Sequence, residues 1–146
     1  MGLSLIRSVT LALFSSVAIV PASARADENA KGFACEFTSG IAGSYENGTF
    51  TSKPSAALKM TIENIDLGKQ SATLHAEGSM GGKLAIARAI GANHFLEVAN
   101  EGYWNITTIY DTDRKTGLNP AVHSRHLGVV GQPLFAQYTG TCRAAP

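Results

Sequence analysis

The sequence of 146 residues contains only two cysteines and no long hydrophobic run. Its most apolar stretch, residues 9–20, is shorter than the roughly 17 to 25 residues that a membrane helix needs. Runs of lysine and arginine are also missing. The sequence therefore indicates neither nucleic acid nor an anionic membrane surface as a partner, and we expect no stable membrane insertion.

The first 26 residues have the features of a secretion signal. Arg7 provides a positive charge ahead of the apolar stretch, and residues 21–26 (PASARA) offer small side chains for cleavage after Ala24 or Ala26. We therefore expect a signal peptide over 1–26, a single domain over 27–146, and a location in the bacterial periplasm or outside the cell. Without Arg7 and Arg25, ten basic residues stand against eleven acidic ones, so the exported part is nearly neutral.

The two cysteines, Cys35 and Cys142, lie near the two ends of the exported part. An even number of cysteines in an exported chain predicts a disulfide, here one that joins the first segment to the last. Both thiols are then committed to this bond, which removes them as candidates for catalysis or metal binding.

The exported part reads as eight to nine short strands with turns between them. Residues 33–37 and 58–62 alternate apolar with smaller or polar side chains, and Asn-Gly within residues 45–50 predicts a tight hairpin. Residues 84–90 also fit a helix, but their glycine flanks and short length favour a strand.

This pattern predicts an all-β fold. A disulfide brings its two Cα atoms within about 7 Å, so the first and last strands must approach each other. We therefore favour an antiparallel barrel of about eight strands, closed by a disulfide between the first and last strand. A β-sandwich is the alternative.

The densest polar cluster is residues 123–126 (HSRH). In a strand, His123 and His126 would point to opposite faces, which argues against a metal pair, and no Gly-x-Ser-x-Gly elbow accompanies the serine. We expect no metal, no cofactor and no catalytic residue. Arg125, on the face of His123, is the candidate to bind a carboxylate, either that of a ligand or that of Glu97.

His123 and His126 are candidate ligand contacts together with Arg125, and three further residues join them. Arg88 shares a strand face with the apolar residues of 84–90, so we expect it to point into the core or to reach the barrel mouth. Trp104 and Tyr110 are expected to face inward, where they would pack in the core or line a ligand cavity. Because alanines also belong to the inward set, the sequence leaves open whether the interior is packed or hollow.

Two terminal segments, residues 33–40 (FACEFTSG) and 124–142 with QYTGTC at its end, resemble small uncharacterised β-rich proteins exported by α-proteobacteria. This resemblance implies a periplasmic location and no particular activity. Lipocalins are an architectural comparison, but their Gly-x-Trp motif is absent from residues 33–40, so a lipocalin-like role rests on shape alone.

These observations predict a non-catalytic periplasmic β-barrel, a monomer, that binds a partner protein or a small apolar ligand and supports the cell envelope. One alternative is a secreted, host-directed protein, such as an inhibitor of lysozyme or another secreted enzyme, that inserts the polar loop of residues 111–120. A small hydrolase that uses His123 or His126 is the second alternative. A pocket reached by Arg88 or Arg125 would favour ligand binding.

Overall fold

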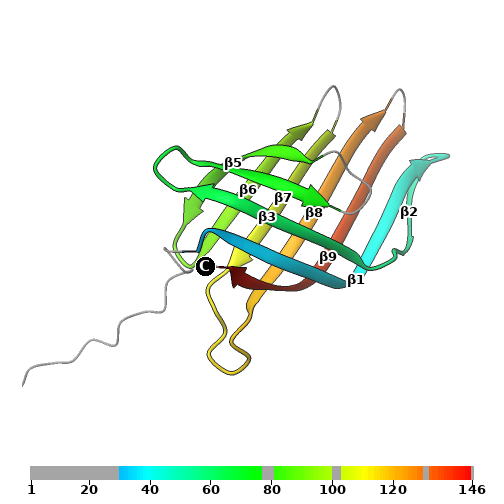
Figure 1. The fold of residues 1–146 in the computed structure, drawn as a ribbon. Coiled ribbons are helices and arrows are strands. Elements are labelled where there is room, and N and C mark those ends of the chain that lie inside the picture. Colours follow the sequence, from blue (N-terminus) through cyan, green and yellow to red (C-terminus); the bar gives the residue numbers. More distant parts are fainter. Residues whose placement is uncertain (1–29, 77–80, 100–102, 130–131, 146) are drawn as a thin grey trace, which may run out of the picture.

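The computed structural model describes residues 30–76, 81–99, 103–129 and 132–145 (Figure 1). The described residues form nine strands and confirm the predicted all-β class. These are β1 (Gly32–Glu46), β2 (Thr49–Pro54), β3 (Leu58–Asp66), β4 (Ser71–Ala76), β5 (Gly82–Ala89), β6 (Ala92–Ala99), β7 (Tyr103–Tyr110), β8 (Asn119–Val129) and β9 (Gln132–Ala145).

Eight of these strands close into an antiparallel barrel. From β3 to β9 each strand pairs with the next one along the chain, and β1 closes the ring because it pairs with both β3 and β9. Closure confirms the predicted barrel and shows that the sandwich alternative is wrong. The remaining strand, β2, pairs with β1 outside the ring.

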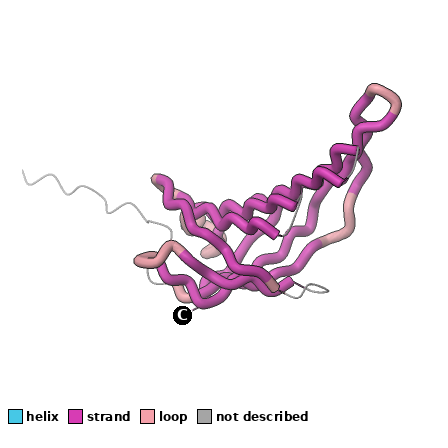
Figure 2. Tube along the Cα trace, turned by 90° about the horizontal axis from the view of Figure 1, so that it is seen from above, coloured by secondary structure: helices cyan, strands magenta, loops and turns pink. Residues whose placement is uncertain are grey.

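The length of β1 explains how one strand serves three neighbours. Along one edge, its first half pairs with β3 and its second half, Ile41–Glu46, pairs with β2, while the other edge pairs with β9. The turn of the β1–β2 hairpin is Asn47-Gly48, with φ angles of 51° and 83°, which confirms the predicted Asn-Gly hairpin. Figure 2 shows this hairpin projecting beyond the other strands.

The disulfide lies across the strand pair that closes the barrel. Cys35 of β1 and Cys142 of β9 are register partners with their Cα atoms 4.0 Å apart, which confirms the predicted first-to-last connection. The bond is consistent with a protein outside the cytoplasm. No helix with the length and apolar character to cross a bilayer occurs among the described residues. The predicted signal peptide and its cleavage sites lie outside the described residues.

The apolar core fills the barrel around this disulfide. Its large members come from inward positions on β1, β3, β4, β5, β6, β7 and β9: Phe33, Phe37, Met60, Ile62, Leu74, Leu84, Ile86, Phe95, Ile109 and Tyr138. Residues 84–89 belong to strand β5, so the helix alternative for 84–90 is wrong. Ile90 stands in the turn after β5 and is fully exposed, because the chain reverses there at Gly91.

Candidate functional site

The barrel interior changes from apolar to polar along its length. Toward the end of the barrel where β8 ends and β9 begins, which we call the Arg125 end, polar side chains occupy inward positions. Glu97, Asn105 and Arg125 are register neighbours in one cross-strand row, and Thr107 pairs with His123 in the next row. Asn105 donates from Nδ2 to Glu97 Oε2 over 2.8 Å, and its own Oδ1 is buried without a partner among the described residues.

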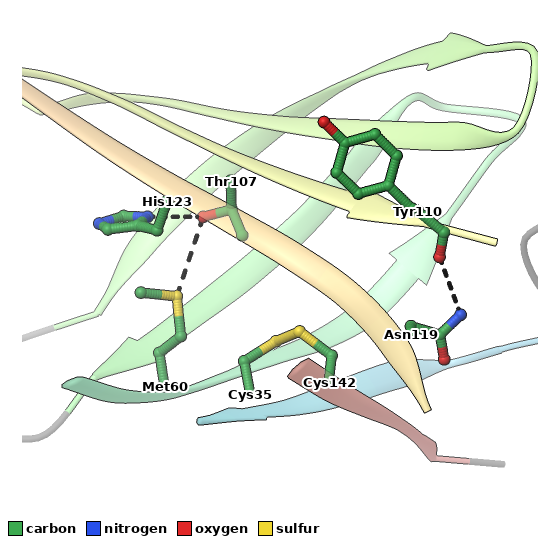
Figure 3. The surroundings of a disulfide bond; sticks show 7 residues. All are labelled: Cys35, Met60, Thr107, Tyr110, Asn119, His123 and Cys142. Carbon is green, nitrogen blue, oxygen red and sulfur yellow. Dashed lines mark hydrogen bonds between the residues drawn. A yellow bond between two sulfur atoms is a disulfide. The ribbon is translucent and has the colours of Figure 1, made fainter. Parts of the chain in front are cut away.

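A chain of hydrogen bonds fixes the side chain of Arg125. Arg125 Nε donates to His123 Nε2 over 3.0 Å, and His123 Nδ1 lies 2.8 Å from Thr107 Oγ1. Because Nε2 accepts a hydrogen bond from Arg125, the neutral imidazole carries its hydrogen on Nδ1 and donates a hydrogen bond to the threonine hydroxyl. The threonine hydroxyl then donates to Met60 Sδ at 3.8 Å, as the dashed lines of Figure 3 show.

His123 is held in its neutral form. Burial, and to a lesser extent the neighbouring charge of Arg125, lower its pKa to about 3. A neutral imidazole is what Arg125 requires here, since a protonated ring would offer a donor instead of an acceptor. The buried histidine therefore serves as a fixed acceptor for the guanidinium.

The aromatic ring of Tyr138 forms a platform for the same guanidinium. The Arg125 Cζ atom lies 5.6 Å from the ring centroid, within the range of a cation–π contact. The ring packs over Gly40, its register partner on β1, where a Cβ atom would clash with it. At the far end of the ring, the Tyr138 hydroxyl lies 3.0 Å from Ser55 Oγ.

These contacts leave the two Nη groups of the guanidinium available for further hydrogen bonds. Nε of Arg125 is bonded to His123, whereas the two Nη groups have no hydrogen-bond or ion-pair partner among the described residues. The result is an oriented fork of N–H donors on the inner face of the sheet, beside a half-buried apolar surface.

The fork lines a hollow of about 660 Å³ between the β1–β2 hairpin and the adjoining parts of β8 and β9. Apolar lining comes from Leu127, Leu134 and Ala136, and Lys53 and Glu46 are the other charged residues of its wall. Glu46 already accepts a hydrogen bond from Ser44 over 2.7 Å. The hollow therefore combines an apolar wall with one more cation than anions.

No family model, curated protein or solved structure matches the chain. The chemistry of the site therefore follows from its own residues. Among the described residues, no group of three or more His, Cys, Asp or Glu side chains is placed to hold a metal ion.

The predicted orientation of Trp104 and Tyr110 is wrong. Trp104 is 52% exposed and Tyr110 is 44% exposed, because the inward positions of β7 belong to Asn105, Thr107 and Ile109. In Figure 3 the Tyr110 ring points away from the disulfide.

Trp104 instead lines an open groove of about 830 Å³ on the outer face of the sheet. His126, its register partner on β8, lines the same groove, so His123 and His126 do lie on opposite faces as predicted. Phe50 and Phe135 contribute to the groove, with their ring centroids 6.1 Å apart.

The structure distinguishes between the alternatives for Arg88 and for the carboxylate partner of Arg125. Arg88 is exposed near the end of β5, which corresponds to the barrel-mouth alternative and not to the core. Arg125 donates a hydrogen bond to His123 and lies over the ring of Tyr138, so it does not pair with Glu97. The Glu97 carboxylate accepts a hydrogen bond from Asn105 instead. Tyr138 was not among the predicted site residues, although counting back in twos from Cys142 places it on the inner face.

Proposed function

We propose that this protein is a non-catalytic periplasmic β-barrel that binds a small, largely apolar ligand at its Arg125 end and serves the cell envelope. The hollow beside Arg125 is the observation that carries this proposal. Its volume lies within the range of small-molecule sites, and it combines apolar walls with few polar groups, as such sites do. The predicted signal peptide, the disulfide and the resemblance to exported proteins support the periplasmic location.

Binding of an uncharged apolar probe tests this proposal. Isothermal titration calorimetry with 1-decanol is expected to show saturable binding, and native mass spectrometry of the purified protein is expected to show a retained small molecule. Ala42→Phe would fill the hollow from β1 and abolish decanol binding. Ala85→Phe, at an exposed position of β5, is the matched control and leaves binding unchanged. Absence of decanol binding to the wild-type protein would refute the proposal.

The β7–β8 loop favours a second candidate function, inhibition of lysozyme or of another secreted enzyme. This loop projects from the barrel in Figure 1. It is held in shape by hydrogen bonds from Gly117 N to Asp113 O and from Asp113 N to Leu118 O, each 2.8 Å long. Its tip presents the exposed cations Arg114 and Lys115. A pre-ordered cationic loop suits the paired carboxylates of a glycosidase cleft.

Lysozyme activity on bacterial cell walls tests this second candidate. Inhibition by the wild-type protein should be lost in an Arg114→Ala/Lys115→Ala variant and retained in Lys83→Ala, which removes a cation from β5 instead. Inhibition that survives removal of both loop cations would exclude insertion of this loop.

The hydrolase alternative receives less support. A histidine that activates a nucleophile must accept its proton, but Nδ1 of His123 carries a hydrogen and Nε2 is occupied by Arg125. The hydroxyl beside it, that of Thr107, is buried. His123 is better explained as a positioning group for Arg125.

A further inference from the structure

Arg125 carries an inference about the chemistry of the ligand. Its guanidinium is held from two directions, by the imidazole acceptor of His123 and by the face of Tyr138. Both partners are buried parts of the barrel wall. A guanidinium oriented in this way loses little conformational freedom when it binds a further group, which increases the affinity that its remaining donors can provide.

The geometry of the remaining donors restricts the partner. The two Nη groups of Arg125 form a planar fork, and a fork of this kind fits two oxygen atoms of one anion in parallel hydrogen bonds. The hollow holds two cations, Arg125 and Lys53, against the carboxylate of Glu46. Among the residues that line the hollow, cations therefore outnumber carboxylates by one, and a bound monoanion would balance this difference.

The two cations do not act at the same place. Lys53 belongs to the cross-strand row of Arg125, but the row passes through Ala136 and Ala42 between them. Three strand spacings separate the two Cα atoms, about 14 Å along the sheet. Lys53 is exposed on β2, so Arg125 is the cation inside the barrel wall.

An apolar surface continues from the fork toward the end of the barrel. Leu127 and Leu134 are register partners in the row that follows Arg125, and both line the hollow. A ligand whose anionic head lies on Arg125 would cover these leucines with its body. Burial of apolar surface there stabilises the complex by about 25 cal/mol for each Å² removed from water.

We infer that the ligand is an amphiphilic monocarboxylate, whose carboxylate binds the Nη fork of Arg125 and whose apolar body lies on Leu127 and Leu134. This inference rests on the proposed function, because it names the ligand class of the same hollow. Tyr138 and His123 are positioning residues, since they orient the guanidinium and only Arg125 binds the carboxylate of the ligand.

Calorimetry with three probes of equal chain length tests the inference: decanoate, decyl sulfate and 1-decanol. Wild-type protein is expected to bind decanoate about 10- to 100-fold more tightly than 1-decanol, the range of a charge-assisted pair of hydrogen bonds. Decanoate is also expected to bind more tightly than decyl sulfate, because the sulfate spreads its single charge over three oxygen atoms, each a weaker hydrogen-bond acceptor than a carboxylate oxygen. Equal affinities for decanoate and decyl sulfate would overturn the carboxylate assignment.

Variants locate the interaction. Arg125→Gln is expected to reduce decanoate affinity to that of 1-decanol while 1-decanol affinity stays at the wild-type value, and Arg125→Lys is expected to lose most of the preference because it keeps the charge without the fork. Arg114→Gln, on the β7–β8 loop, is the matched control and keeps the wild-type preference. A preference lost in Lys53→Gln and kept in Arg125→Gln would overturn the inference.

The outcomes separate this inference from the proposed function. Equal affinity of wild-type protein for decanoate and 1-decanol would refute carboxylate recognition and leave the apolar site intact. Failure of both probes to bind would refute the proposed function itself. The comparison of probes uses wild-type protein only, so it decides the question even where an Arg125 variant fails to fold.

Discussion

Removal of the disulfide is expected to destabilise the barrel by an amount that can be calculated. The bond encloses 108 residues, Cys35 to Cys142 inclusive. In the chain-entropy relation, a loop of this length restricts the unfolded chain by about 16 cal/mol/K, equivalent to about 5 kcal/mol at 25 °C. Because a domain of this size has a total stability of about 5 to 15 kcal/mol, the bond provides a large part of it.

The perturbation is a Cys35→Ala/Cys142→Ala double variant, compared with oxidised wild-type protein by urea unfolding. With a slope of about 1 to 3 kcal/mol per molar urea, the midpoint should fall by about 2 M or more. Reduced wild-type protein is the cross-check, since it keeps both buried sulfur atoms. A loss below about 1 kcal/mol would refute the entropic reasoning. It would mean that the twelve register pairs between β1 and β9 hold the barrel closed without the bond.

Three further predictions follow from single residues. The pKa of His123 is about 3 in the fold against 6.5 in the unfolded chain, which therefore binds the proton first. The free energy of unfolding should fall by about 1.4 kcal/mol per pH unit below pH 6.5. The free energy of unfolding, measured with urea at several pH values, should depend less steeply on pH in His123→Gln than in the wild-type protein, and as steeply in His126→Gln. The same pH dependence in His123→Gln and the wild-type protein would contradict this prediction. Gly140→Ala should cost about 1 to 3 kcal/mol in thermal unfolding, because its Cβ would meet the backbone of β1. Gly128→Ala should not lower the stability, because the space around Gly128 is open. A Gly140→Ala protein of wild-type stability would contradict the register between β1 and β9. Trp104 fluorescence should be quenched by acrylamide and unaffected by decanoate, because the indole lies on the outer face; a decanoate-dependent change would place the ligand in the outer groove.

The fold was largely predictable from the sequence because its signals are local. Alternating side chains and the Asn47-Gly48 turn identify strands and a hairpin without knowledge of their partners. Cys35 and Cys142 supplied the long-range information, since a disulfide brings two strands together. The position of β2 outside the ring was not predicted, because nothing local distinguishes a strand inside the ring from one paired outside it.

The candidate site was predictable only in part, because the interior of this barrel is polar at one end. Trp104 and Tyr110 were expected inside since large aromatic side chains usually avoid water. Their strand instead turns Asn105 and Thr107 inward, where Glu97 and His123 provide hydrogen-bond partners. A rule based on hydrophobicity therefore assigns the two faces of this strand in reverse. The shared face of His123 and Arg125 was predicted correctly because it depends only on strand alternation.

The central claim, that Arg125 holds the carboxylate of a ligand, is tested most directly by nuclear magnetic resonance of bound decanoate labelled with ¹³C at its carboxyl carbon. The chemical shift of this carbon, followed as the pH is lowered, reports whether the head group is ionised. A carboxylate paired with a guanidinium has a pKa about 1 to 3 pH units below that of the free acid. We expect such a decrease in the wild-type complex and its loss in Arg125→Gln. A bound carboxyl group with the pKa of free decanoate would contradict it.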